Sequence, residues 1–129
     1  MSAEITGKYL SVTSFKRDGT GVATPVWFVA DNGNLLVETD ADSYKAKRIG
    51  RNPSVVVAPC SASGRLRGAA LPAKAEFLAD SERQRVERLI ARKYRVDRLL
   101  VLPIYRVVQR LRGRSLPHEK PVVLSITPT

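Results

Sequence analysis

The chain has 129 residues, a length that suits one domain with a hydrophobic core of its own. Its single cysteine excludes an internal disulfide and a cysteine-based metal cluster, and no apolar run reaches the roughly 20 residues that a transmembrane helix requires. The formal net charge is +10, and after residue 43 there are 19 Lys and Arg against six Asp and Glu. Such a surface attracts anions, whether nucleic acid, anionic lipid or a small polyanionic ligand.

The first third of the sequence predicts strands joined by tight turns. Lys8–Ser14 alternates polar and apolar residues and is expected to form a strand. Val22–Ala30 is rich in β-branched and aromatic residues and is expected to form a second strand. Because proline removes a donor from the ladder, we expect its regular pairing to lapse at Thr24-Pro25-Val26; the alternative is an ordinary edge-strand proline. Asn32-Gly33 predicts a hairpin turn, since both residues tolerate positive φ, and Leu35–Thr39 is the return strand.

A short basic helix is predicted directly after this hairpin. We expect it to span Tyr44–Ile49 and to end at Gly50, with its N-terminus capped by one of several side chains: Thr39, Asp40, Asp42 or Ser43. Four cations lie within two turns: Lys45, Lys47, Arg48 and Arg51. Free N–H groups and positive charge at a helix start would hold a phosphate or a carboxylate. The alternative is a solvated basic helix on an ordinary surface.

Three further strands or strand-like segments follow. Ser54–Cys60 is a nearly continuous apolar run, which predicts burial on both faces. Arg65–Leu78 contains Gly68 and Pro72, so we expect one long, bent strand of the kind that barrel closure requires. Val122–Thr127 is the closing strand. Neighbouring strands joined by hairpins favour an antiparallel barrel.

Two helices are predicted before the closing strand. The first opens at Asp80–Gln84, where Ser81 and Gln84 fit a capping box, and runs to about Tyr94. The second spans Arg98–Arg112 and is apolar early and basic late.

The sequence lacks the side chains of most familiar catalytic sites. His118 is the only histidine, so a histidine triad or a multi-histidine metal site is not expected, and we predict no metal site. There is no P-loop and no G-x-G-x-x-G motif. This pattern fits an enzyme whose cofactor carries the reaction, although a non-enzyme lacks such residues too.

The order of short motifs resembles a known family. TPVWF at residues 24–28, then ET, SYKAKRI, NP and a Val-rich strand look like the flavin and deazaflavin oxidoreductases of the pyridoxamine-phosphate-oxidase-like superfamily, and most of all the actinobacterial branch that uses coenzyme F420. The resemblance covers about Gly7 to Ile126. It implies a mainly β fold with some α (α+β): a six-stranded antiparallel split β-barrel, the FMN-binding split barrel, with short flanking helices. Residues 1–129 would form one such domain.

The resemblance also implies a set of cofactor-binding residues, although no catalytic residue. Four positions would lie along the cofactor ring: Thr24, Pro25, Val26 and Trp27. Thr39 and Lys45 match the phosphate-contacting positions, Lys47 and Arg48 would assist them, and Cys60 and Ser61 are weaker candidates. Core or interface packing is the alternative for Trp27. The family's oxidases have an arginine before the lysine where this chain has Tyr44, which favours F420 over FMN.

The function that the resemblance implies is an F420-dependent oxidoreductase that transfers a hydride between the reduced deazaflavin and a small organic acceptor. The alternatives are an FMN- or haem-binding split-barrel protein of another function, and a basic binder of nucleic acid or membrane surfaces. Such a binder would need aromatic residues interleaved with its basic ones, and here they are widely spread. We therefore expect F420, with FMN as the alternative cofactor, a homodimer with sites between subunits, no nucleic-acid partner, no stable membrane insertion and a cytoplasmic location.

Overall fold

The computed structural model describes residues 5–95 and 120–129. The elements of this part of the chain are β1 (Tyr9–Phe15), β2 (Gly21–Val26), β3 (Val29–Asp31), β4 (Asn34–Asp40), α1 (Tyr44–Arg51), β5 (Ser54–Cys60), β6 (Leu71–Phe77), a 3-10 turn η1 (Asp80–Glu82), α2 (Arg83–Lys93) and β7 (Pro121–Pro128). The predicted second helix, Arg98–Arg112, and His118 lie outside the described residues.

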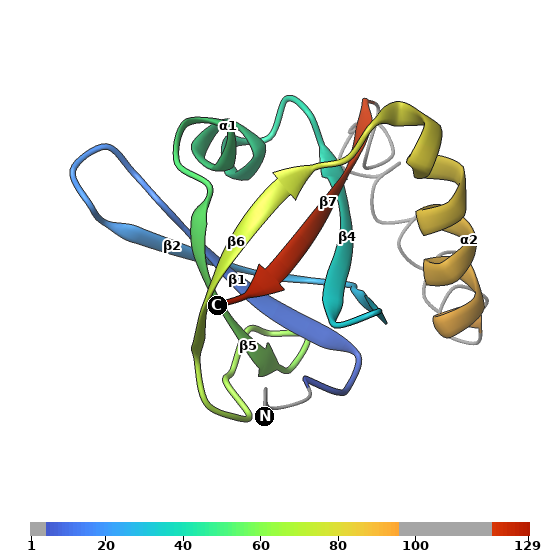
Figure 1. Ribbon diagram of the computed structural model, residues 1–129. Helices are drawn as coiled ribbons and strands as arrows, with labels where there is room; N and C mark the ends of the chain where they lie inside the picture. The colour runs from blue at the N-terminus through green and yellow to red at the C-terminus, as the bar shows by residue number, and fades with distance from the viewer. Residues whose placement is uncertain (1–4, 96–119) are drawn as a thin grey trace, which may run out of the picture.

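The strands form one curled antiparallel sheet in the order β2-β1-β5-β6-β7-β4-β3 (Figure 1). Its two edge strands, β2 and β3, follow each other in the sequence, and only Trp27 and Phe28 separate them. The chain itself therefore crosses from one edge to the other, which confirms the predicted split β-barrel with flanking helices. We find seven strands in the described residues rather than six, because the predicted strand Val22–Ala30 pairs first with β1 and then with β4.

The tyrosine at the end of α2 holds the chain where it crosses between the sheet edges. The Tyr94 hydroxyl accepts a hydrogen bond from the Phe28 N–H at 3.0 Å and lies 2.9 Å from the Phe28 carbonyl and 2.6 Å from the Lys8 carbonyl, to either of which it can donate. The Tyr94 ring stacks on Trp27, with centroids 4.3 Å apart. One buried side chain thus satisfies backbone groups that no neighbouring strand reaches.

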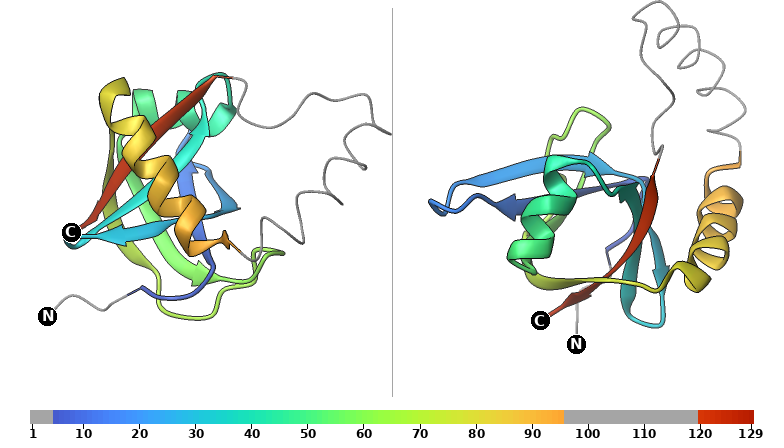
Figure 2. Two further views of the ribbon diagram at one scale, coloured as in Figure 1. Left: turned by 90° about the vertical axis from the view of Figure 1, so that its right-hand side faces the viewer. Right: turned by 90° about the horizontal axis from the view of Figure 1, so that it is seen from above.

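The two described helices occupy different places on the barrel (Figure 2). The inward faces of the strands form the main core, and α1 contributes Ile49, which is 2% exposed, to that core. The longer helix α2 lies on the outside of the sheet, where Val86 and Ile90 pack with Leu36 of β4 and Val123 of β7. The α1 helix therefore covers one end of the barrel, whereas α2 covers part of its outer wall.

The local signals of the hairpin and of the basic helix are confirmed. Asn32 and Gly33 both have positive φ, 52° and 82°, as a two-residue hairpin turn requires. The Ser43 side chain caps α1 by accepting from the Ala46 N–H at 3.1 Å. Gly50, however, does not end the helix, which continues to Arg51. The helix can continue because Gly50 lacks the positive φ of a helix-ending glycine.

Three other predictions of local structure are wrong. Pairing with β1 stays regular through Pro25, because β2 is an edge strand whose outer side needs no ladder donor. The segment Arg65–Leu78 forms a strand only over Leu71–Phe77, and residues 61–70 are a loop with one isolated bridge from Leu66 to Cys60. The capping box at Ser81 is absent, since neither η1 nor α2 has a side-chain cap.

Candidate functional site

The four cations of α1 divide into two pairs. Lys47 and Arg51 are exposed, as a solvated basic helix would have them. Lys45 and Arg48 are partly buried. Lys45 precedes Ile49 by four residues, so it lies one turn earlier on the helix face that points into the barrel core. The position of this face, rather than the number of charges, decides which cations the barrel shields from water.

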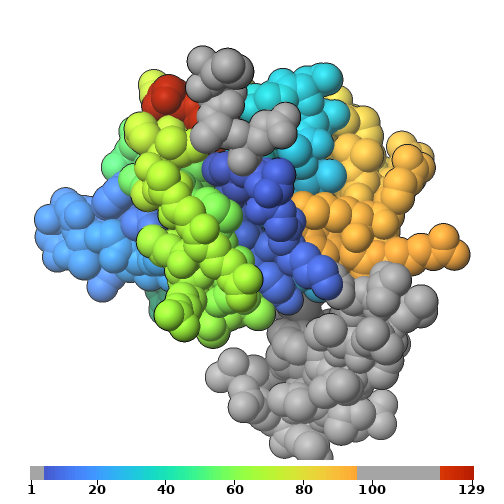
Figure 3. Space-filling view, turned by 90° about the horizontal axis from the view of Figure 1, so that it is seen from below, coloured from blue at the N-terminus to red at the C-terminus, as the bar shows by residue number. Residues whose placement is uncertain are grey.

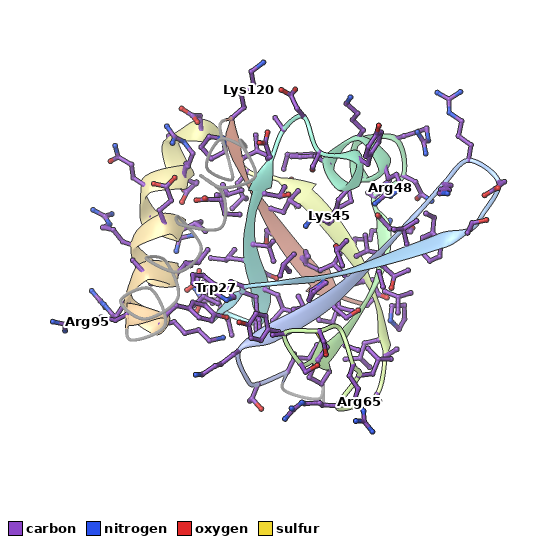
Figure 4. All side chains as sticks on the ribbon, turned by 180° about the vertical axis from the view of Figure 1, so that it is seen from behind. Trp27, Lys45, Arg48, Arg65, Arg95 and Lys120 are labelled. Carbon is purple, nitrogen blue, oxygen red and sulfur yellow. The ribbon has the colours of Figure 1, made fainter. Side chains whose placement is uncertain are left out.

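Lys45 lies in an electrostatically unusual place. Burial, and to a lesser extent the nearby charge of Arg48, lower the pKa of its ammonium group from 10.5 to about 8. Among residues 5–95 and 120–129 no carboxylate forms an ion pair with it. Figure 4 shows Lys45 directed from α1 toward the barrel, with Arg48 beside it. A desolvated cation without a counter-ion is the state that a bound anion relieves.

Arg48 is fixed in position by the first strand. Its Nε donates to the Ser14 Oγ at 2.7 Å, and Ser14, on β1, is fully buried. Ser14 pairs across the sheet with Val22 of β2. This contact ties the guanidinium of Arg48 to the inner face of the β1–β2 pair, and in the described residues its terminal nitrogens form no further hydrogen bond.

Thr39 lies where β4 leads into α1. Its side chain is 3% exposed, and its Oγ1 lies 3.5 Å from the Ser43 Oγ, which also donates to the Asp40 carbonyl at 2.7 Å. Thr39 and Val37 are two residues apart on β4, and Val37 is part of the barrel core, so Thr39 also faces inward. The start of α1 is thereby joined to the inner face of the barrel.

Thr24 carries a buried polar atom that lacks a partner. In the described part of the chain its Oγ1 is the one buried side-chain oxygen or nitrogen without a hydrogen bond. Thr24 lies opposite Val12 of β1, so it shares the inner face with Val26, which packs against the core. Burying a hydroxyl without a partner is costly, and a ligand along the inner edge of β2 would remove this cost.

The remaining predicted ring contacts point elsewhere. Pro25 is exposed on the outer side of β2. Trp27 stacks on Tyr94 and belongs to the cluster between the sheet and α2, as the packing alternative for this residue describes. A role of either residue in cofactor binding stays a prediction.

Cys60 and Ser61 lie at the other end of β1. Cys60 pairs with Tyr9, five residues before Ser14, which places the two ends of the strand about 17 Å apart. Cys60 is 5% exposed, and burial raises the pKa of its thiol. The structure therefore brings Thr39, Lys45 and Arg48 to the α1 end of the barrel. Together with Thr24, which lies halfway along the β1–β2 pair, they form what we call the α1 site, and Cys60 and Ser61 lie outside it.

Sequence analysis missed two residues that build this region, Ser14 and Tyr94. Ser14 had a detectable signal: in the alternation of β1 it occupies an inward position after Leu10 and Val12, where an apolar residue is expected. Tyr94 had none, because its partners are backbone groups 66 and 86 residues away in the sequence.

The described residues form neither a metal-ligand cluster nor a membrane-spanning helix. No three His, Cys, Asp or Glu side chains in this part of the chain come together as metal ligands. Neither helix among these residues has the length and the apolar character that crossing a membrane would require.

Comparisons with known proteins place this geometry in a family. Residues 6–114 match the sequence profile described as pyridoxamine 5′-phosphate oxidase. A search of curated proteins gave no match.

Solved structures share the fold at low identity. A conserved hypothetical protein of Mycobacterium tuberculosis is 20% identical with a TM-score of 0.67, and the match covers 95% of this chain and 74% of the other. The haem storage protein HutZ of Vibrio cholerae is 16% identical with a TM-score of 0.59, and the match covers 95% of this chain and 82% of HutZ. An F420-H2-dependent reductase is 19% identical with a TM-score of 0.57, and the match covers 96% of this chain and 99% of the reductase. At these identities the likeness shows a common fold.

Proposed function

The chain belongs to the pyridoxamine 5′-phosphate oxidase family, and we propose that it is an oxidoreductase that binds a flavin-type cofactor, with F420 preferred over FMN. The observation that carries this proposal is Lys45, a desolvated ammonium with no carboxylate partner in the described residues. Folding around such a group is costly, and an anion that belongs to the site would offset the cost.

The residues of the α1 site fit a cofactor that carries a phosphate. Lys45 and Arg48 would hold the phosphate with charge-assisted hydrogen bonds. Thr39, at the same end of the barrel, would contact the phosphate as well. The orphan hydroxyl of Thr24 would meet a polar atom of the cofactor farther along β2. When bound in its reduced form, the cofactor supplies a hydride, two electrons with one proton, to an organic acceptor that takes a second proton from solvent.

The preference for F420 rests on charge and on the motif that precedes Lys45. F420 carries a phosphate and a polyglutamate tail, and the exposed cations Lys47 and Arg51 can attract the carboxylates of that tail. Tyr44 replaces the arginine of the family's oxidases, so the positive charge that would contact the FMN phosphate is missing. The Tyr44 side chain is 78% exposed. The motifs that resemble the actinobacterial F420 branch support the same choice.

A side-by-side titration tests this proposal. Fluorescence quenching should show tighter binding of F420 than of FMN, and absorbance titration with haem serves as the comparison for a storage or carrier role. The same fold occurs in a haem storage protein, so the haem titration is an informative control. Equal or tighter binding of FMN, or tight binding of haem alone, would reject F420 as the cofactor.

We also propose that the protein is a homodimer. Ala23 and Pro25 are exposed on the outer side of β2, an edge strand with a single neighbour in the sheet. An apolar edge of this kind is usually covered. A stable dimer would bury about 2,000 Å² or more. Light scattering at low micromolar concentration should give twice the chain mass of 14.2 kDa, and a monomer mass there would reject the dimer.

A further inference from the structure

A cavity lies at the end of β1 that is remote from α1. Its volume is about 510 Å³, within the range of small-molecule sites. The residues that line it come from the start of β1, the end of β5 and the loop at residues 61–70; those that matter here are Lys8, Tyr9, Pro59, Cys60, Ser61 and Arg67. Figure 3 shows this loop, in light green, alongside the start of β1 in dark blue.

The walls of the cavity are held by backbone contacts. The Arg67 N–H donates to the Pro59 carbonyl at 2.8 Å, which fixes the loop against the end of β5. A Cβ atom at Gly68 would lie 2.7 Å from the Pro59 ring, so only glycine lets the loop come this close. On the other wall, the Lys8 carbonyl is 2.6 Å from the Tyr94 hydroxyl, which ties it to α2. The cavity is therefore built into the fold rather than left by a loose loop.

The lining combines positive charge with apolar surface. Lys8 and Arg67 bring two cations, and no acidic residue lines the cavity in the described part of the chain. Arg67 and Cys60 both line the cavity, and the charge of Arg67 opposes the rise that burial causes in the pKa of the Cys60 thiol. Tyr9 and Pro59 add ring surface. This combination suits an organic molecule with an apolar body and a carboxylate or another anionic group.

The position of the cavity relates it to the α1 site. The strand β2 runs antiparallel to β1, from Val22 opposite Ser14 to Val26 opposite Leu10. A cofactor anchored at the α1 site and extended along Thr24 and Val26 therefore points toward the end of β1 where the cavity lies. Pro59, which lines the cavity, pairs with Leu10 across the β1–β5 ladder and so faces the same side of the sheet as Val26.

We propose that this cavity is the acceptor site and that its ligand is a small organic anion with an apolar body. The acceptor role rests on the proposed function, whereas the binding of the anion does not. The two parts can therefore be tested separately, and binding is measured first, without any cofactor.

The binding test uses benzoate as the anionic probe and benzamide as its neutral counterpart. In amide-resolved NMR spectra of the full chain, benzoate should shift the signals of Ser61 and Arg67 at concentrations where benzamide does not. The variant Arg67→Gln should weaken benzoate binding about tenfold, as loss of a charge-assisted hydrogen bond does. Arg65→Gln is the matched control, because Arg65 is in the same loop, does not line the cavity and is directed away from the barrel (Figure 4).

The alkylation rate of Cys60 provides a second measurement of the effect of the Arg67 charge in the cavity. It is the only cysteine of the chain, so mass spectrometry of alkylated protein reports this cavity alone. Iodoacetate and iodoacetamide are similar in size, and their rate ratio cancels any change in the thiolate fraction. Relative to a free thiol, the ratio should favour iodoacetate about threefold or more, and Arg67→Gln should abolish this preference while Arg65→Gln keeps it.

Three outcomes would overturn the proposal: no shift with benzoate, equal shifts with benzamide, or equal losses in the Arg67 and Arg65 variants. A further arm separates the acceptor site from the proposed cofactor site. Benzoate should bind whether or not F420 is present. Displacement of F420 by benzoate would assign the cavity to the cofactor and reject an acceptor site. Failure of F420 to bind at all, with benzoate binding intact, would reject the proposed function but leave the anion site.

Discussion

The two described helices are both rich in cations, but only the cations of α2 form ion pairs with carboxylates in the described residues. On α2, Arg83 pairs with Asp80 at 3.0 Å and Glu87 at 3.4 Å, and Arg85 pairs with Glu82 and Asp31. These carboxylates raise the pKa of both arginines. On α1, burial lowers the pKa of Lys45, and its first turn contains no acidic residue.

The difference shows that a run of positive charge has no single meaning. The paired arginines of α2 have their counter-ions within the protein, so they contribute to the stability of the fold. Lys45 has no counter-ion among the described residues, so no ion pair there offsets the cost of its desolvation. The account therefore predicts that substitutions on α1 affect binding while substitutions on α2 affect only stability.

The largest effect is expected for Lys45→Met, which keeps an unbranched side chain only one atom shorter and removes its charge. Loss of a charge-assisted hydrogen bond to the phosphate costs about 1.5–3 kcal/mol, so F420 binding should weaken by roughly 10- to 150-fold. Fluorescence titration measures this change. Lys47→Met on the exposed side of the same helix is the control and should change the affinity far less. Equal losses in both variants would make Lys45 an ordinary surface charge.

The dependence of binding on pH should show the same lysine. The free protein has a Lys45 pKa of about 8, and a bound anion raises it, so binding is full below pH 8 and weakens as the amine loses its proton above it. The affinity should fall by up to about tenfold per pH unit above 8. Titrations at pH 7, 8 and 9 check this, and the decline should vanish in Lys45→Met. A flat profile in the wild type would argue against Lys45 as the binding cation.

Removal of the same charge should stabilise the protein without cofactor. The folded pKa of Lys45 lies below its unfolded value of 10.5, so the unfolded chain binds more protons between pH 8 and pH 10.5, and stability rises with pH in that window. Lys45→Met should gain about 1–3 kcal/mol at pH 7 and lose this advantage toward pH 10.5. Urea unfolding at several pH values measures the difference. A destabilised variant at pH 7 would mean that Lys45 has a partner within the fold.

The smallest effect is expected on α2. Arg85→Met removes the ion pairs with Glu82 and Asp31, which lie at the surface in contact with solvent and contribute little. The melting temperature should drop slightly at low salt and less at high salt, and F420 affinity should stay unchanged. A clear loss of binding in this variant would show that the two helices are not separate in function.

Local signals in the sequence account for most of the fold. The Asn32-Gly33 turn, the Ser54–Cys60 strand and the Ser43 cap depend on neighbouring residues, and each is confirmed. The division of Val22–Ala30 into β2 and β3 could not be predicted, because it depends on two strands that pair with its halves from opposite edges of the sheet. Residues 65–70, predicted as the start of a strand, belong to a loop, because the contact of Arg67 with the Pro59 carbonyl is not encoded locally either.

The site was predictable only in part. The motif resemblance assigned Lys45 and Arg48, and the structure places both at one end of the barrel, with Thr24 halfway along the β1–β2 pair. Their difference from Lys47 depends on how α1 docks on the core, and the one hint was Ile49, four residues after Lys45. The partner of Arg48, Ser14, lies 34 residues away in the sequence.

The protonation of Lys45 tests the central claim most directly. NMR titration of labelled lysine side chains, with the Lys45 signal identified by its absence in Lys45→Met, gives its pKa in the free protein and with F420. The account predicts a pKa of about 8 in the free protein and a rise on binding, because the phosphate supplies the missing counter-ion. A pKa near 10.5 that does not change with F420 would contradict it.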